Sequence, residues 1–314
     1  MGGPLPVDVH TVVTHWDIAP FSFAVLALSV LAVAWYVAAM AKLETRGRRW
    51  ARRRLVSFAL GVATVEIALG SSVAVLAGTS FPAHIVQHLL LMVVAPPLLA
   101  LGAPMTLALQ TSARPTKVRL LKVLHSRPFA VITHPVLVWF LYYGSMIAFF
   151  LSPALGFAMD HMFVMDVINV AFLGGATLFW WPMVGLDPIP RWQMGHGLRF
   201  LNLLIGIPFE SFLGVALLLS SRPVAPMYTL AGTHAGGGLL WAATEAATAV
   251  ALVPMFSQWF TADTRQAVRD DARRDRAVRV AQAAAAGSGP ATDPTPIRAG
   301  WATTFAQMRR DPLD

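Results

Sequence analysis

The sequence contains no cysteine among its 314 residues. Disulfides, thiolate metal sites and a cysteine-based copper shuttle are therefore excluded, so a soft metal would have to be bound by histidine and methionine. Charge is also scarce: 13% of the residues are charged, against about 25% in soluble domains. The only lysines are Lys42, Lys117 and Lys122, all in predicted loops, which excludes a retinal protein with a Schiff base inside a span.

Apolar residues make up 56% of the chain and are arranged in long blocks. A helix that crosses a bilayer needs about 20 consecutive, mainly apolar residues, and helices satisfy their own backbone groups in lipid. The sequence therefore predicts an all-α integral membrane bundle of about seven transmembrane helices. The predicted spans cover approximately residues 21–41, 55–78, 84–109, 131–151, 161–184, 198–220 and 239–260.

The formal net charge of +8 predicts the orientation of this bundle. Basic residues collect in the segments 42–54 and 111–127, before the sixth span and after the seventh, and basic loops stay cytoplasmic. This pattern places the N-terminus outside and the C-terminus in the cytoplasm, and it explains the charge without a nucleic-acid partner. Residues 1–20 lack the cationic start of a cleaved signal peptide, so we expect an extracytoplasmic lead-in.

Three further segments carry local predictions. Residues 152–160 are expected to form a short loop, and the Gly/Pro-rich residues 221–238 a longer one. The membrane domain is expected to cover residues 21–260. Residues 261–314 are expected to form a charged tail, a solvated helix at first and largely disordered afterwards.

The third predicted span contains two features of interest. Pro96 and Pro97 should kink its helix, which a membrane protein tolerates where other helices satisfy the freed carbonyls. His84 and His88 open the span, and residues four apart share a helix face. Met92 follows one turn later, so the three side chains suit a soft or borderline metal such as copper. The alternative is a pair of interfacial histidines hydrogen-bonded to neighbouring groups.

Other ionisable residues fall near the same outer end of the bundle. Charged groups inside a bilayer are costly and usually face the bundle interior. We therefore expect an outer polar pocket in which His161 and His234 are additional metal ligands. Asp166 is either a ligand or an acceptor that orients an imidazole, and Glu210 and Glu245 support the site from outside the ligand set. Each of these side chains also has a purely structural interpretation, as an interfacial, loop or helix-bridging group.

A set of short motifs resembles the CtaG-type assembly proteins of bacterial cytochrome c oxidase, the multi-span kind rather than the single-span copper chaperone. The resemblance covers about Trp16 to Arg276. Its motifs are Arg46-Gly47-Arg48-Arg49-Trp50, His84-x-x-x-His88, Ala95-Pro96, Leu101-Gly102-Ala103-Pro104, His134-Pro135, Phe179-Trp180-Trp181-Pro182, Gly185-x-Asp187-Pro188, Pro208-Phe209, Phe212-x-Gly214, Gly236-Gly237-Gly238-x-x-Trp241 with Glu245, and Gln258-Trp259.

The resemblance implies a protein of the bacterial plasma membrane that helps to mature haem-copper oxidase, through copper handling at the outer face. Its partners would be an oxidase subunit or a copper donor protein, and no enzymatic turnover is expected. Four positions depart from the family pattern. Ile85 replaces the usual Met, Glu210 and Asn169 stand where many relatives have His, and His234 stands where Gln is common.

Two rival functions remain open at this point. A transporter for copper or another cation would use the mid-span acids Glu66 and Glu210 along its pathway. A haem- or quinone-linked redox protein would use histidines as axial ligands. Two histidines on adjacent turns of one helix cannot hold both faces of one haem, which favours a metal ion.

Overall fold

The computed structural model describes residues 19–187, 192 and 194–286, and these form helices with no strand among them. The predicted all-α class is therefore confirmed. The helices are α2 (Pro20–Glu44), α3 (Arg52–Gly70), α4 (Ser72–Ala77), α5 (Phe81–Leu89), η1 (Leu90–Val94), α6 (Ala95–Leu101), α7 (Pro104–Thr111), α8 (Arg114–Leu124), α9 (Arg127–Ile132), α10 (Pro135–Trp139), η2 (Phe140–Gly144), α11 (Ser145–Phe150), α12 (Ala154–Asp160), α13 (Met162–Val184), α14 (His196–Leu218) and α15 (Leu230–Ala286).

Several of these helices fit a multi-pass membrane protein. Within the described residues, five are long and apolar enough to cross a membrane, and a sixth is obtained if α10–α11 and α12, bent by 78°, count as one span. The second predicted span corresponds to α3 and α4, which are not among the five. The count of seven spans and the orientation of the termini therefore stay predictions.

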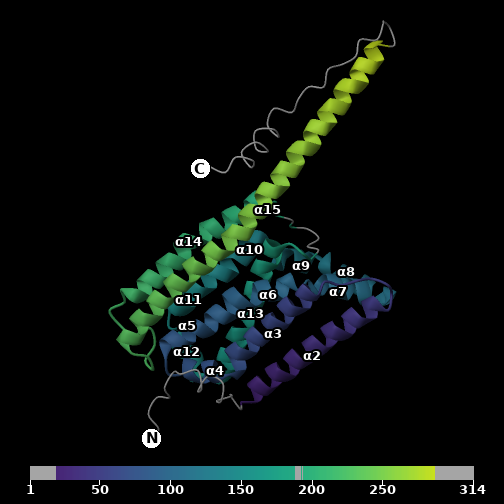
Figure 1. Ribbon diagram of the computed structural model, residues 1–314. Coiled ribbons are helices and arrows are strands. Elements are labelled where there is room, and N and C mark those ends of the chain that lie inside the picture. The colour runs from purple at the N-terminus through teal and green to yellow at the C-terminus, as the bar shows by residue number, and fades with distance from the viewer. Residues whose placement is uncertain (1–18, 188–191, 193, 287–314) are drawn as a thin grey trace, which may run out of the picture. The chain divides into compact units, whose positions relative to one another are not determined.

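The chain divides within α15 into two units, Met1–Val253 and Pro254–Asp314. The first unit contains all the other helices. In it, α3 packs between α2 and α6, and α6 also packs on α13 (Figure 1). Tyr36 of α2 joins these layers, because its hydroxyl donates to Gly102 O at 2.6 Å and accepts a bond from Trp50 Nε1 at 2.9 Å. Phe58 of α3 stacks on the same ring.

The proline break in the third predicted span forms as expected. A proline at position i lacks the N–H that would bond the carbonyl of residue i−4, so Pro96 leaves Met92 O without a helical partner. The chain passes this point in a π-helical turn, η1, and Met92 O accepts bonds from Trp180 Nε1 at 3.0 Å and Tyr142 OH at 3.4 Å. The freed carbonyl therefore links α13 and η2, through these two hydrogen bonds, to the helix that carries the histidines.

Two loop predictions are wrong. Residues 154–160 form helix α12, and the predicted loop 221–238 ends early because α15 begins at Leu230. The glycines at 236–238 lie inside α15, where they allow close helix packing. A Cβ at Gly237 would lie 2.6 Å from Leu218 N and 2.8 Å from Gly214 O, both backbone atoms of α14. Small residues serve this purpose between membrane helices.

The second unit covers the segment that was expected to begin as a solvated helix. The end of α15 continues to Ala286, and the described side chains of its charged run are almost all exposed. Arg273 and Asp270 form an exposed ion pair at 3.5 Å on this helix. The lead-in 1–18 and the predicted disordered residues 287–314 lie outside the described part of the chain.

Candidate functional site

The predicted histidine pair faces the interior of the helix bundle. Helix α5 begins at Phe81 with Pro82 in its first turn, and the helical repeat then places His84 and His88 on one face, with 1% and 0% of their surfaces exposed. Their Nε2 atoms lie 2.9 Å apart, which is a hydrogen bond. The rings of Phe149, Phe150 and other aromatic residues surround the pair. Two adjacent imidazoles are thus held in an apolar shell.

Tyr228 holds the other end of His84, and sequence reasoning missed it. Its hydroxyl lies 3.1 Å from His84 Nδ1 and donates to Ala77 O at 2.6 Å. Burial raises the pKa of this hydroxyl, which therefore keeps its proton near neutral pH. Tyr228 belongs to the Gly/Pro-rich segment between α14 and α15, and no residue spacing in the sequence links it to α5.

A cavity of about 280 Å³ borders His84, and we call it the methionine cavity. Three thioethers line it, from Met159 of α12 and from Met162 and Met165 of α13. Asp166 lines the same space, so the structure brings this predicted residue and His84 to one cavity. Met162 is 74% exposed, which opens the cavity to the surroundings of the bundle.

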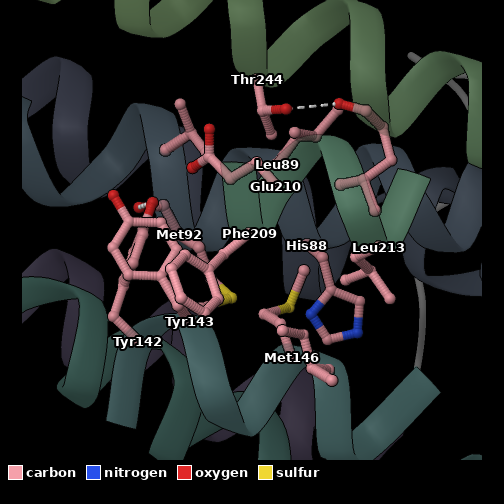
Figure 2. Close-up of a pocket in the computed structure, with 13 residues that line it drawn as sticks. His88, Leu89, Met92, Tyr142, Tyr143, Met146, Phe209, Glu210, Leu213 and Thr244 are labelled. Atoms are coloured by element: carbon pink, nitrogen blue, oxygen red, sulfur yellow. Dashed lines mark hydrogen bonds between the residues drawn. The ribbon is translucent and has the colours of Figure 1, made fainter. Parts of the chain in front are cut away.

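A smaller cavity of about 30 Å³ borders His88, and we call it the His88 cavity (Figure 2). The predicted residues Met92 and Glu210 line it together with His88. Met146 of α11, which sequence reasoning did not select, contributes a second thioether. Figure 2 shows Met92, Met146 and the His88 ring among the side chains that line this cavity. His88 Nδ1 is buried and has no hydrogen-bond partner among the described residues.

Three other predicted residues, His161, His234 and Glu245, lie outside the linings of both cavities. His161 is exposed at the start of α13, and its Nδ1 is 2.8 Å from Phe157 O. His234 lies on α15 rather than in a loop, with Nε2 2.8 Å from Ser220 O. Glu245 accepts a bond from Ser211, and Glu210 one from Thr248. Nowhere in the described part of the chain do three or more His, Asp, Glu or Cys side chains gather as a metal site.

Asp187 has a structural role that its place in a motif did not reveal. Its carboxylate accepts bonds from Met105 N at 3.1 Å and Thr106 N at 2.7 Å, so it caps the first turn of α7. The chain enters α7 through Ala103, which has a positive φ of 50°. Burial raises the pKa of the Asp187 carboxyl, although the bonds from Thr106 and Met105 oppose the shift.

The comparison with protein families gives one match, over residues 34–262, to the family described as cytochrome c oxidase caa3 assembly factor. The chain belongs to this family. The matched residues include every residue that lines the His88 cavity and, except for Phe21, every residue that lines the methionine cavity. The resemblance drawn from the motifs is therefore confirmed, and the family's name describes assembly of an oxidase rather than a catalysed reaction.

Curated relatives occur in mycobacteria. Over 290 residues the chain is 30% identical to uncharacterized protein Mb0105 of Mycobacterium bovis and to uncharacterized protein MT0111 of Mycobacterium tuberculosis. It is 28% identical to uncharacterized protein ML1998 of Mycobacterium leprae. Each alignment covers 87% of this chain but 43% of the relative, so the chain spans less than half the length of these relatives. No solved structure matches the chain.

Proposed function

We propose that this family member binds copper at the His84/His88 pair and supports metallation of a cytochrome c oxidase subunit at the outer face of the bacterial plasma membrane. The observation that carries the proposal is the burial of two imidazoles in contact, one of them with a free ring nitrogen. Polar groups inside a membrane bundle are costly, and where they persist they mark ion or substrate sites.

The donor atoms fit copper. Imidazole and thioether are ligands that copper accepts, and the chain has no thiol to offer. The two Nε2 atoms are hydrogen-bonded to each other at 2.9 Å, so the ring nitrogen of the pair that remains for copper is Nδ1 of His88. The same short separation leaves no space for a porphyrin between the rings, which favours a metal ion over haem.

The methionine cavity offers an entry path. The exposed Met162 lines the same cavity as Met165, Met159 and His84, so a metal that reaches Met162 has further thioethers and an imidazole within one cavity. Asp166 places a carboxylate beside this path, which attracts a cation. The roles of His161 and His234 as further ligands stay predictions, because neither joins a three-donor group in the described chain.

The test is the copper content of purified protein, combined with oxidase activity in cells that carry the same variants. His84→Ala/His88→Ala should lose bound copper, remain inserted in the membrane and leave the cells short of oxidase activity. His125→Ala/His134→Ala is the matched control, since it removes two histidines outside the buried pair. Equal copper in both variants would remove the proposed site. Normal oxidase activity with the first variant would refute the assembly role, and copper uptake by proteoliposomes would favour a transporter instead.

A further inference from the structure

The hydrogen bonds around His84 and His88 determine which ring nitrogens carry protons. Ala77 O can only accept, so the single hydroxyl proton of Tyr228 is directed to it at 2.6 Å. The Tyr228 oxygen then accepts from His84 Nδ1–H at 3.1 Å. A neutral His84 protonated at Nδ1 has a bare Nε2, which accepts from His88 Nε2–H at 2.9 Å.

The chain of donors ends at His88 Nδ1. With its proton at Nε2, the neutral His88 ring has a lone pair on Nδ1, and no described residue donates to this atom. His88 is completely buried, so the lone pair is not exposed to bulk water. An acceptor left without a partner in an apolar interior is destabilising, and such an atom beside a cavity marks a place for a ligand.

The cavity beside this atom supplies sulfur ligands. Met92 and Met146 reach it from different helices, η1 and α11, and both side chains are drawn in Figure 2. Its volume of about 30 Å³ admits a single small ion or one water molecule. Glu210 places a carboxyl group on the wall of the same cavity.

We propose that His88 Nδ1, Met92 Sδ and Met146 Sδ form a site selective for Cu(I), the atomic site of the copper binding proposed above. Two thioethers and one neutral imidazole are soft donors that suit Cu(I), whereas Zn²⁺ and Cu(II) favour several nitrogen or oxygen ligands. The site rests on the proposed function for its biological use. Its chemistry rests on the unpaired nitrogen and the two sulfurs.

The experiment measures Cu(I) affinity in detergent-purified full-length protein, by competition with a chromogenic Cu(I) chelator under ascorbate. Met146→Leu and Met92→Leu each should weaken Cu(I) binding by about 10-fold or more, since replacing a supporting group at a metal site already costs about 10–100-fold. Met40→Leu is the control, because Met40 packs against the buried cluster that contains Tyr36, Trp50 and Phe58, which includes neither histidine. Zn²⁺ and Cu²⁺, titrated as competitors, should displace little Cu(I).

X-ray absorption supplies a readout that needs no substitution. Protein grown with selenomethionine should show selenium scattering in the copper spectrum and copper scattering in the selenium spectrum. A spectrum with nitrogen and oxygen neighbours alone, or unchanged affinity in both methionine variants, overturns the Cu(I) site. If His84→Ala/His88→Ala loses copper while the methionine variants keep it, copper binding stands and this site fails. If the histidine variant also keeps copper, the proposed function fails with it.

Discussion

Tyr228→Phe tests directly which ring nitrogens of His84 and His88 carry protons. The substitution removes one oxygen atom from a buried ring and leaves the helices their packing. Without that oxygen, His84 Nδ1–H loses its acceptor at 3.1 Å and Ala77 O loses its donor at 2.6 Å. The proton of His84 is then free to move to Nε2, where it faces His88 Nε2–H, and His88 must move its own proton to Nδ1. Copper would have to displace that proton before it binds.

The expected size of the effect follows from these bonds. Orienting groups behind a metal ligand are typically worth about 10–100-fold in affinity. The dissociation constant for Cu(I) should therefore rise by this factor, equivalent to about 1.4–2.7 kcal/mol. Each buried group left without a partner costs about 1–3 kcal/mol, so the free energy of unfolding should fall as well. The assay is chelator competition for Cu(I) together with thermal unfolding of the same preparation.

Tyr36→Phe provides a matched control. The Tyr36 hydroxyl also donates to a backbone carbonyl at 2.6 Å and also accepts from a ring N–H, that of Trp50 at 2.9 Å. Both variants should therefore lose similar stability, but only Tyr228→Phe should lose copper affinity. A folded Tyr228→Phe protein that binds Cu(I) as tightly as Tyr36→Phe would refute the proposed chain of protons from Tyr228 to His88.

Two further predictions concern the fold. Gly237→Ala should destabilise the protein by about 1–3 kcal/mol, because its Cβ would meet backbone atoms of α14 at 2.6 and 2.8 Å. Gly238→Ala should be tolerated, since its nearest neighbour is a Leu218 methyl at 3.7 Å; equal melting temperatures would contradict the close contact. Asp187→Asn should alter the pH dependence of unfolding. Burial raises the pKa of this carboxyl, so the folded chain binds the proton more tightly than the unfolded chain. The wild type should therefore gain stability relative to Asp187→Asn as pH falls from about 7 toward the usual range of an aspartate, and lose that gain as pH rises through the folded-state pKa. Parallel stability curves for the two proteins would contradict this sign.

The sequence was sufficient for features that depend on short spacings. The four-residue interval of His84 and His88 predicted a shared helix face, and the pair does share one. The position of Pro96 predicted a broken helix with a carbonyl satisfied from outside, and Trp180 supplies that donor. Both inferences use the geometry of one helix, which sequence alone determines.

The features that were missed depend on contacts between distant segments. Met146 and Tyr228 reach the histidine pair from other parts of the chain, and helical periodicity does not say which helices are neighbours. The glycines of α15 were misinterpreted as a loop signal. In a soluble protein a run of glycines usually marks a turn, but between membrane helices small residues permit backbones to approach, as Gly237 shows.

The unpaired polar atoms give the most direct support for a ligand site. Within the described residues, four buried side-chain atoms have no hydrogen-bond partner: Ser72 Oγ, His88 Nδ1, Asn169 Oδ1 and Trp181 Nε1. His88 lines the His88 cavity, whereas Asn169 lines the methionine cavity on the His84 side. Unsatisfied groups are thus found on both sides of the histidine pair, next to thioethers in each case. A bundle that satisfies even the carbonyl freed by Pro96 would gain stability by satisfying these atoms too. The unpaired atoms beside the histidine pair are explained if a bound ligand supplies their missing partner. A cation that prefers nitrogen and sulfur ligands fits His88 and its two methionine neighbours.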